Sequence, residues 1–182
     1  QGGFDGNGVT IKNLKMNGGR LIGLIGYVLG TGAQRYEIRG ITIDKSCSFT
    51  GTGQFVGSVV GAGSNITIFD CHNAGAMVVS SNTYVGGIVG RVSVGMIDYC
   101  SSNANVSGSA YVGGIVGEVY SGAITNNTVG MDLTQGERII VSSNSNMFGA
   151  IAGFCQNSSG VENYYNGMTV VGMYGKKEYH GH

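Results

Sequence analysis

Acidic and imidazole side chains lie near the same place in two successive repeats of this sequence, where they could act as general acids and bases. Asp70 and His72 lie nine and eleven residues after Gly61, and Asp98 lies eight residues after Gly90 in a related segment. Carbohydrate-cleaving enzymes use carboxyl pairs, which in a retaining glycosidase stand about 5 Å apart, with a raised pKa on the acid. The offsets mix opposite faces of a strand, so Asp98 need not face Asp70. We interpret the three as solvated turn residues that could contact a ligand.

A second candidate contact region is the charged stretch 35–39, with the sequence RYEIR. Arg35, Tyr36 and Arg39 could contact a ligand from a loop. The arginines of the chain form no dense basic patch, and 10 Lys and Arg balance 10 Asp and Glu. Zero net charge removes the usual electrostatic signature of a nucleic-acid-binding protein. We therefore predict no nucleic-acid partner.

Sequence motifs for metal, cofactor and nucleophile chemistry are absent. Neither HExxH nor GxSxG occurs, and no Walker lysine follows the glycine-rich start. The stretch 5–8 (DGNG) lacks the closing Glu of a calcium loop, so a turn is expected there. His180 and His182 could bind a metal, but we interpret them as part of an exposed terminus. We predict no catalytic, metal or cofactor-binding residues, no cofactor, and a protein that is not an enzyme.

An internal repeat must position these side chains. One phrase recurs as LIGLIG, FVGSVVG, YVGGIVG, YVGGIVG and MFGAIAG, and two further apolar pieces follow each copy before the next begins. The pieces are short, rich in Val, Ile, Tyr and Thr, and separated by Gly, Ser and Asn turns, which is typical of strands. The phrases end at glycines spaced 35, 29, 27 and 36 residues apart, which we call the closing glycines: Gly26, Gly61, Gly90, Gly117 and Gly153.

Short apolar pieces of this kind become stable by stacking on their own copies. Each strand can then pair with its counterpart about 4.8 Å away, and each coil contacts only its neighbours. The repeat predicts an all-β parallel β-helix, or β-solenoid, of five to six coils, with Ile88 above Ile115. We expect residues 1–182 to be one domain, a piece of a longer chain, with an irregular end at 168–182. The two long spacings predict looped inserts near Thr31–Asp44 and Asp132–Arg138.

Four cysteines, Cys47, Cys71, Cys100 and Cys155, would permit disulfides in a secreted protein. Cys71 and Cys100 each lie ten residues after a closing glycine, as does Asn127. These three should form one column with parallel Cβ vectors, which suit a disulfide poorly. We interpret the two cysteines as small core residues, with Asn127 bonded to neighbouring backbone. The sequence leaves the redox state of the thiols open.

The phrases YVGGIVG, FVGSVVG and LIGLIG resemble GLUG repeats, and the opening GGFDGNGVTIKNLKM is similar to the segment that commonly precedes them in bacterial surface proteins. The resemblance covers about Gly2 to Gly167. It implies a right-handed parallel β-helix in a secreted or surface-anchored bacterial protein. Such repeats occur in adhesin-like proteins and in non-catalytic regions of bacterial immunoglobulin A peptidases. The repeat has no known catalytic residues that could be carried over.

The predicted function is a non-enzymatic extracellular module, a rigid scaffold that presents a lateral binding face to a glycan or a cell-surface protein. No run of about 18 apolar residues occurs, so we predict no membrane span. Two alternatives stay open. One is a carbohydrate-active β-helix enzyme, and the other is a filament built by pairing of the strand edges at the ends of the stack.

Overall fold

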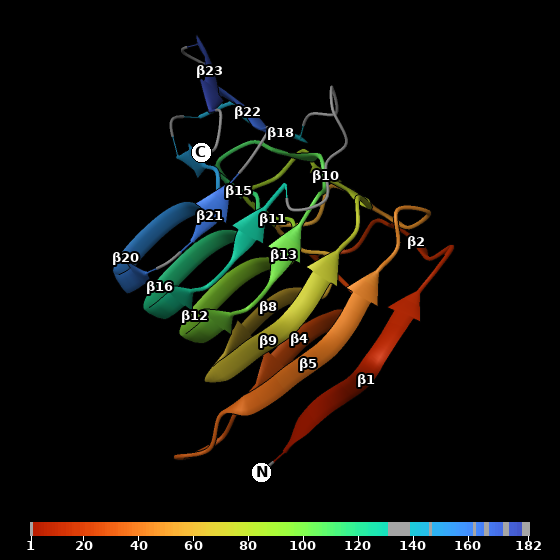
Figure 1. The fold of residues 1–182 in the computed structure, drawn as a ribbon, viewed down its shortest axis with the longest axis vertical. Helices are drawn as coiled ribbons and strands as arrows, with labels where there is room; N and C mark the ends of the chain where they lie inside the picture. The colour runs from red at the N-terminus through yellow and green to blue at the C-terminus, as the bar shows by residue number, and fades with distance from the viewer. Residues whose placement is uncertain are drawn as a thin grey trace.

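The chain is an all-β parallel solenoid in the computed structural model (Figure 1). The structure describes residues 2–130, 139–145, 147–161, 163–165, 168–172 and 175–179. Strands far apart in sequence lie side by side, running from the red N-terminal β1 to the blue C-terminal end. This confirms the predicted fold class, whereas the handedness and the number of coils stay predictions. The described residues include no helix that could cross a membrane.

The largest sheet carries both the core and the candidate site. Its main path runs β20–β16–β12–β9–β13–β17–β21, with β1 and β5 beyond β9, and with β4 and β8 beside β12. The long strands β12 and β16 each cover a length of the sheet that two shorter strands, such as β8 and β9, cover in an earlier coil. The members are β1 (Gly3–Ile11), β4 (Ile25–Leu29), β5 (Tyr36–Ile43), β8 (Val60–Ser64), β9 (Ile66–Asn73), β12 (Val89–Asp98), β13 (Ser101–Ser102), β16 (Val116–Thr125), β17 (Thr128–Val129), β20 (Ala152–Val161) and β21 (Tyr164–Tyr165).

Two further sheets close the cross-section of the solenoid. One follows the order β2 (Lys15–Asn17), β6 (Ser48–Gly51), β10 (Met77–Ser80), β14 (Val106–Gly108), β18 (Ile139–Ser143), β22 (Met168–Gly172) and β23 (Gly175–Tyr179). The other follows the order β3 (Leu21–Ile22), β7 (Phe55–Val56), β11 (Tyr84–Gly86), β15 (Tyr111–Gly113) and β19 (Phe148–Gly149). The pairings within both sheets are parallel except that of β22 with β23.

The repeat phrase stacks in register, as the sequence predicts. The Ile88 amide donates to the Ile115 carbonyl at 2.9 Å, and the Val59 amide donates to the Ile88 carbonyl at 2.9 Å. Ile68 pairs with Ile97, which pairs with Ile124, and all three are buried. Equivalent apolar side chains of successive coils therefore form continuous columns, and this burial stabilises strands too short to stand alone.

The closing glycines are required by close approach of the backbone. A Cβ on Gly117 would stand 2.5 Å from the Gly90 carbonyl oxygen, and one on Gly90 would stand 2.5 Å from the Gly61 oxygen. A Cβ on Gly61 would meet the Gly26 oxygen at 2.6 Å. Gly26 differs, because its nearest such neighbours belong to Leu21 at 3.7 Å. Gly61, Gly90 and Gly117 are thus each constrained by the coil before them, whereas Gly26 in the first coil is not.

A column of left-handed residues bends the largest sheet between its inner strands. Asp70, Tyr99 and Asn126 occupy equivalent positions with φ of 51°, 52° and 52°, and Gly40 has φ of 65°. Asp and Asn tolerate this region, and Gly adopts it freely, but a bulky side chain such as that of Tyr99 is unfavourable there. Side chains before the bend and side chains after it therefore point in different directions.

The Cys and Asn column lies in the core, as predicted. All four cysteines are free thiols, with Cys47, Cys71 and Cys100 buried and Cys155 exposed. Burial raises the pKa of the Cys100 thiol. Asn127 accepts a hydrogen bond from the Cys100 amide at 2.9 Å and donates to a neighbouring carbonyl. Asn163 accepts from Asn127 at 3.0 Å, so an asparagine ladder continues the column.

Two segments differ from the sequence prediction. The insert near Thr31–Asp44 is mostly strand, because β5 takes residues 36–43 and only the short link before it is loop. Spacing alone cannot separate a loop from a strand that pairs with β1 and β9. In the range 168–182, where an irregular end was expected, β22 and β23 form an antiparallel pair. The insert at Asp132–Arg138 lies outside the described residues.

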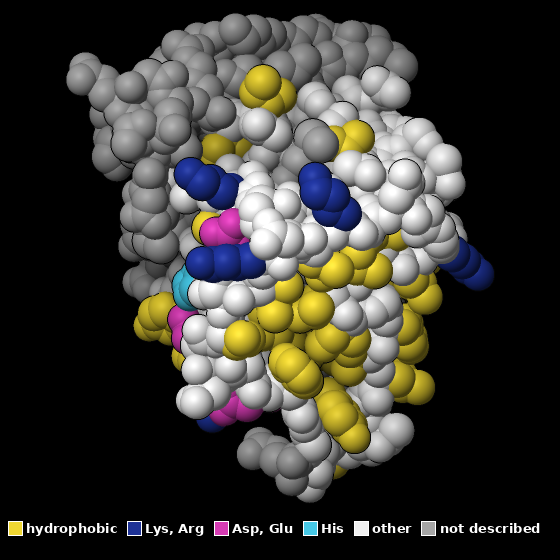
Figure 2. Space-filling view, turned by 90° about the vertical axis from the view of Figure 1, so that its right-hand side faces the viewer, with side chains coloured by type: hydrophobic (Ala, Val, Ile, Leu, Met, Phe, Trp, Pro, Cys, Tyr) yellow, Lys and Arg dark blue, Asp and Glu magenta, His cyan; other side chains and the backbone are white. Residues whose placement is uncertain are grey.

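The N-terminal end of the stack exposes apolar surface. Figure 2 shows hydrophobic side chains gathered on the face near β1, and six of the exposed large ones lie within residues 4–36. Core-facing side chains of this first coil, such as Met16 and Ile25, are only partly buried, whereas their partners Phe49 and Val60 are fully buried. The unpaired edge and open core belong to the same coil.

Candidate functional site

Two columns of side chains, all polar except Phe69, run along the outer surface of the largest sheet, one on each side of the left-handed bend. The register aligns the members of each column across successive coils, while the isoleucines beside them point inward. We call these two columns and the bend between them the lateral face. The first column is Asp5, Arg39, Phe69, Asp98 and Thr125. The second is Thr10, Thr42, His72, Ser101 and Thr128.

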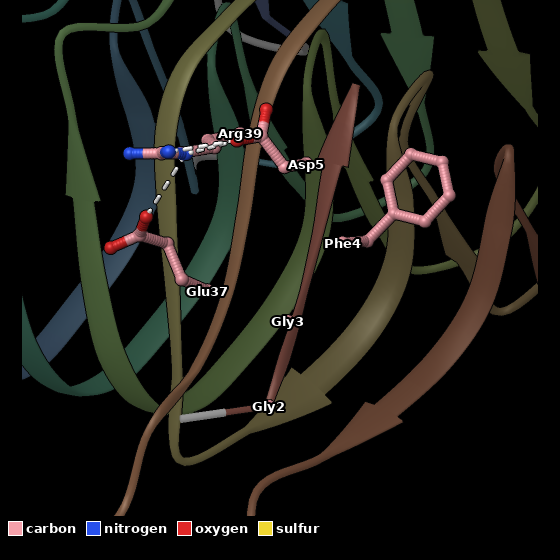
Figure 3. Close-up of a pocket in the computed structure, with 6 residues that line it drawn as sticks. All are labelled: Gly2, Gly3, Phe4, Asp5, Glu37 and Arg39. Carbon is pink, nitrogen blue, oxygen red and sulfur yellow. Dashed lines mark hydrogen bonds and ion pairs between the residues drawn. The ribbon is translucent and has the colours of Figure 1, made fainter. Parts of the chain in front are cut away.

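Arg39 anchors the N-terminal part of the lateral face. Its Nη2 and Nε contact Asp5 Oδ2 at 2.7 and 2.9 Å, and its Nε lies 3.4 Å from Glu37 Oε1. Figure 3 shows the guanidinium between the two carboxylates, with Phe4 on the other side of β1. The Asn7 amide, and after it Arg39, lowers the pKa of Asp5, and Asp5 raises the pKa of Arg39. The ion pair lines a hollow of about 290 Å³.

Asp70 and His72 form a hydrogen-bonded pair beside this ion pair. Asp70 Oδ1 lies 3.0 Å from His72 Nε2, and Ser101 Oγ lies 2.8 Å from His72 Nδ1. Ser101 is only 8% exposed, so this contact with His72 lies at the edge of the buried interior. Asp70 also lines a second hollow of about 210 Å³ that includes Asp5 and Arg39. The structure thus brings Asp70, His72 and Arg39 into one region.

Asp98 lies apart from Asp70 in both register and partners. It aligns with Phe69, and its Oδ1 accepts hydrogen bonds from Thr125 Oγ1 at 2.8 Å and Asn126 Nδ2 at 2.9 Å. The residue equivalent to Asp70 in that coil is Tyr99. The sequence already indicated that Asp98 need not face Asp70, since the two residues have different offsets from their closing glycines.

Tyr99 is a site residue that the sequence analysis missed. Its side chain is 56% exposed in spite of the left-handed backbone, and its ring meets Phe69 edge-on with centroids 5.7 Å apart. Tyr99 shares the offset of nine residues with Asp70, so counting from the closing glycine would have placed it on this face. In the register of the two coils Phe69 aligns with Asp98, and Tyr99 is equivalent to Asp70, so each ring has a carboxylate at the matching position of the neighbouring coil.

The stretch 35–39 does not form the contact loop predicted from sequence. Arg35 ends the short link before β5 and is exposed, while Tyr36 and Arg39 belong to the strand itself. Tyr36 lies close to Gly2, where an added Cβ would stand 2.6 Å from the ring. Arg39 is therefore held by strand pairing in the lateral face, and Arg35 is not part of that group.

The lateral face is acidic and rich in hydrogen-bond acceptors. Asp5 and Glu37 pair with Arg39, Asp70 lines the same hollow as Arg39, and Asp98 adds a further carboxylate two coils along the first column. Within the described part of the chain, no group of three or more His, Cys, Asp or Glu side chains could hold a metal ion. His180 and His182 lie outside that part. Carboxylates beside exposed aromatic rings can bind hydroxyl-rich ligands.

The fold is similar to that of a Bacteroides ovatus protein of known crystal structure, provisionally described as an immunoglobulin A1 protease. The two share a TM-score of 0.74 and 20% sequence identity, over 97% of this chain and 63% of that chain. At this identity the likeness shows a common fold alone, and the chain spans less than two thirds of that protein. No family model and no curated protein matches the sequence. Membership of the GLUG-repeat family therefore stays a prediction.

Proposed function

We propose that this chain is a non-enzymatic extracellular module of a bacterial surface protein, a rigid solenoid whose lateral face binds a neutral glycan. The observation that carries the proposal is the exposed Tyr99 ring, which meets Phe69 edge-on and is held in an unfavourable backbone conformation. The structural likeness to the Bacteroides ovatus protein supports the extracellular setting weakly, through its provisional description. A cell-surface protein is the alternative ligand.

The chemistry of the lateral face suits sugar hydroxyls. Carboxylates accept hydrogen bonds from hydroxyl donors, and charge-assisted bonds of this kind are stronger than neutral ones. Aromatic rings supply flat apolar contact beside them at low entropic cost. The excess of negative charge disfavours acidic ligands, since like charges repel across a partly desolvated contact. A neutral oligosaccharide satisfies these three conditions.

Backbone strain at Tyr99 supports a functional role for its side chain. A non-glycine residue in the left-handed region costs of order 1–3 kcal/mol, and such strain clusters at binding sites. The equivalent residues Asp70 and Asn126 are types that tolerate this conformation. A purely structural position would therefore favour Asn or Asp at 99 as well. The sequence instead places a large exposed aromatic ring there.

The test is a Tyr99→Asn variant, which fits the backbone and removes the ring. Wild-type protein should bind neutral oligosaccharides on a glycan array, and the variant should lose at least about tenfold in affinity, or about 1.4 kcal/mol. Its unfolding free energy should change by less than about 1 kcal/mol, because relieved strain offsets the lost contact with Phe69. Tyr120→Asn, at another exposed tyrosine, is the matched control. Unchanged glycan binding by Tyr99→Asn would refute the proposal.

Carbohydrate cleavage is the second candidate, and the chain of hydrogen bonds from Asp70 through His72 to Ser101 favours it. A histidine that a carboxylate orients can act as a general base, which carbohydrate cleavage by proton abstraction requires. Incubating the protein with polysaccharides and measuring new reducing ends tests this candidate. Product formation that His72→Asn abolishes would replace the non-enzymatic proposal.

A further inference from the structure

A gap in one outward column creates a separate hollow on the solenoid. The register aligns Tyr27, Ala62, Arg91, Glu118 and Phe154 across β4, β8, β12, β16 and β20. Four of these side chains are large, and Ala62 is the small one. The space that its neighbours fill in other coils is therefore empty above Ala62. The result is a hollow of about 300 Å³, at the lower end of the range for small-ligand sites.

Aromatic rings form two sides of this Ala62 hollow. Tyr27 is 53% exposed at its rim, whereas Phe55 is 9% exposed and lies deeper. Phe55 stacks on Tyr84 with centroids 5.0 Å apart, and Tyr84 stacks on Tyr111 at 4.8 Å. This ladder fixes the position of the Phe55 ring. The hollow thus offers a pre-formed apolar wall that needs no rearrangement before a ligand binds.

Two arginines also line the hollow, and their charges are not equally balanced. Arg91 forms an ion pair with the buried Glu118, although neither contacting atom has a well-directed hydrogen bond. Arg20 Nε donates to Gln54 Oε1 at 3.0 Å, and its guanidinium lies 6.0 Å from the Phe55 centroid. Within the described residues no carboxylate pairs with Arg20. The hollow therefore carries one uncompensated positive charge.

We propose that the Ala62 hollow binds a single acidic sugar residue, such as a hexuronic or sialic acid at the end of a glycan. The Arg20 guanidinium pairs with the sugar carboxylate, and the ring packs against Tyr27 and Phe55. An arginine fork matches a carboxylate in geometry as well as charge. This site goes beyond the lateral face and has the opposite charge, so the two proposals share only the class of ligand.

Titrations of the full chain with glucuronic acid, N-acetylneuraminic acid and glucose test the proposal. Both acidic sugars should bind with a Kd of about 1 mM or lower, and glucose at least tenfold more weakly. Raising the salt concentration should weaken the acidic sugars. Arg20→Gln should reduce their affinity at least tenfold, and Ala62→Leu should block the hollow by filling it. Arg35→Gln, an exposed arginine outside the hollow, makes the same change in charge and should have no effect.

Each other outcome separates this proposal from the function proposed for the lateral face. If acidic sugars still bind to both Arg20→Gln and Ala62→Leu, the Ala62 site is overturned. If only Tyr99→Asn abolishes this binding, the acidic sugars bind at the lateral face instead. The absence of acidic-sugar binding also overturns it, while neutral-glycan binding would still support the lateral face. Equal binding of N-acetylglutamate amide would show a site for acidic peptides and refute the sugar assignment. An unfolding midpoint for Ala62→Leu equal to that of the wild type excludes misfolding as the cause.

Discussion

Alanine at Gly117 should destabilise the solenoid far more than alanine at Gly26, although both glycines close the same phrase. The Cβ at 117 would stand 2.5 Å from the Gly90 oxygen, 2.7 Å from the Val85 nitrogen and 2.8 Å from the Tyr111 oxygen. Ordinary carbon–oxygen contacts are about 3.3–3.6 Å, so the closest one is short by roughly 0.8 Å. All three atoms belong to backbone and cannot rotate away.

The energetic cost follows from what must move to relieve this contact. Hydrogen bonds between strands hold neighbouring coils about 4.8 Å apart. Separating two coils by most of an ångström at this point stretches two or three of those bonds, each worth about 1 kcal/mol. We expect Gly117→Ala to lower the unfolding free energy by about 3 kcal/mol, near the upper end for overpacking. Gly26→Ala should stay within about 1 kcal/mol of wild type, because its nearest neighbours are 3.7 Å away.

Urea denaturation followed by circular dichroism measures both variants. The midpoint of Gly117→Ala should fall clearly below that of Gly26→Ala at an unchanged m-value. A thermal midpoint lower by about 6–12 °C is the corresponding shift for a chain of this length. A difference of less than about 1 kcal/mol between the two variants would refute the claim that coil-to-coil backbone contact requires these glycines.

Three further predictions concern the polar core, the thiols and the stability of the fold at acid pH. Asn127→Ala leaves the buried Cys100 amide without its acceptor and should cost about 2–3 kcal/mol in urea denaturation; a loss below 1 kcal/mol would contradict the ladder. Ellman's reagent should label one thiol of the folded chain, Cys155, and four thiols after denaturation. Labelling of Cys155 should become faster as the pH approaches and passes 9, because burial raises the pKa of this thiol and the thiolate is the reactive form. Fewer than four labelled thiols in denaturant would reveal a disulfide. The pKa of Asp5 is lowered, so its stabilising effect is present above pH 3.8 and is lost as the pH falls through the folded value; Asp5→Asn should flatten the fall in unfolding midpoint below that pH, and an unchanged slope would count against the ion pair with Arg39.

The sequence predicted those features of the fold that the repeat itself dictates. Identical phrases must pair with one another, so the stacking of Ile88 on Ile115 and the column of Cys71, Cys100 and Asn127 followed from counting residues. Residues 31–44 were different, because an extra length between two phrases can loop out or extend a strand. Pairing of β5 with both β1 and β9 decided between these outcomes, and spacing contains no information on it.

The candidate site was less predictable, because it depends on which outward side chains face one another. The sequence singled out Asp70, His72 and Arg39, which the structure brings into one region. Partners such as Ser101 become visible only after a bend with positive φ reorients the strand. The aromatic ladder could have been found, since Phe55, Tyr84 and Tyr111 stand at the same place in three phrases. The open space above Ala62 depends on side-chain volumes in adjoining coils.

Ala62 illustrates how a solenoid can change its recognition properties without altering its backbone. A recess arises wherever one coil has a small side chain in a column of large ones, so a single amino-acid position determines where the recess lies. Enlarging Ala62 would erase the recess with every main-chain bond unchanged, whereas truncating Arg91 to alanine would extend it by one rung and leave the buried Glu118 without its partner. Diversification by point substitution along a fixed frame follows directly, in contrast with folds whose binding specificity resides in loops of variable length.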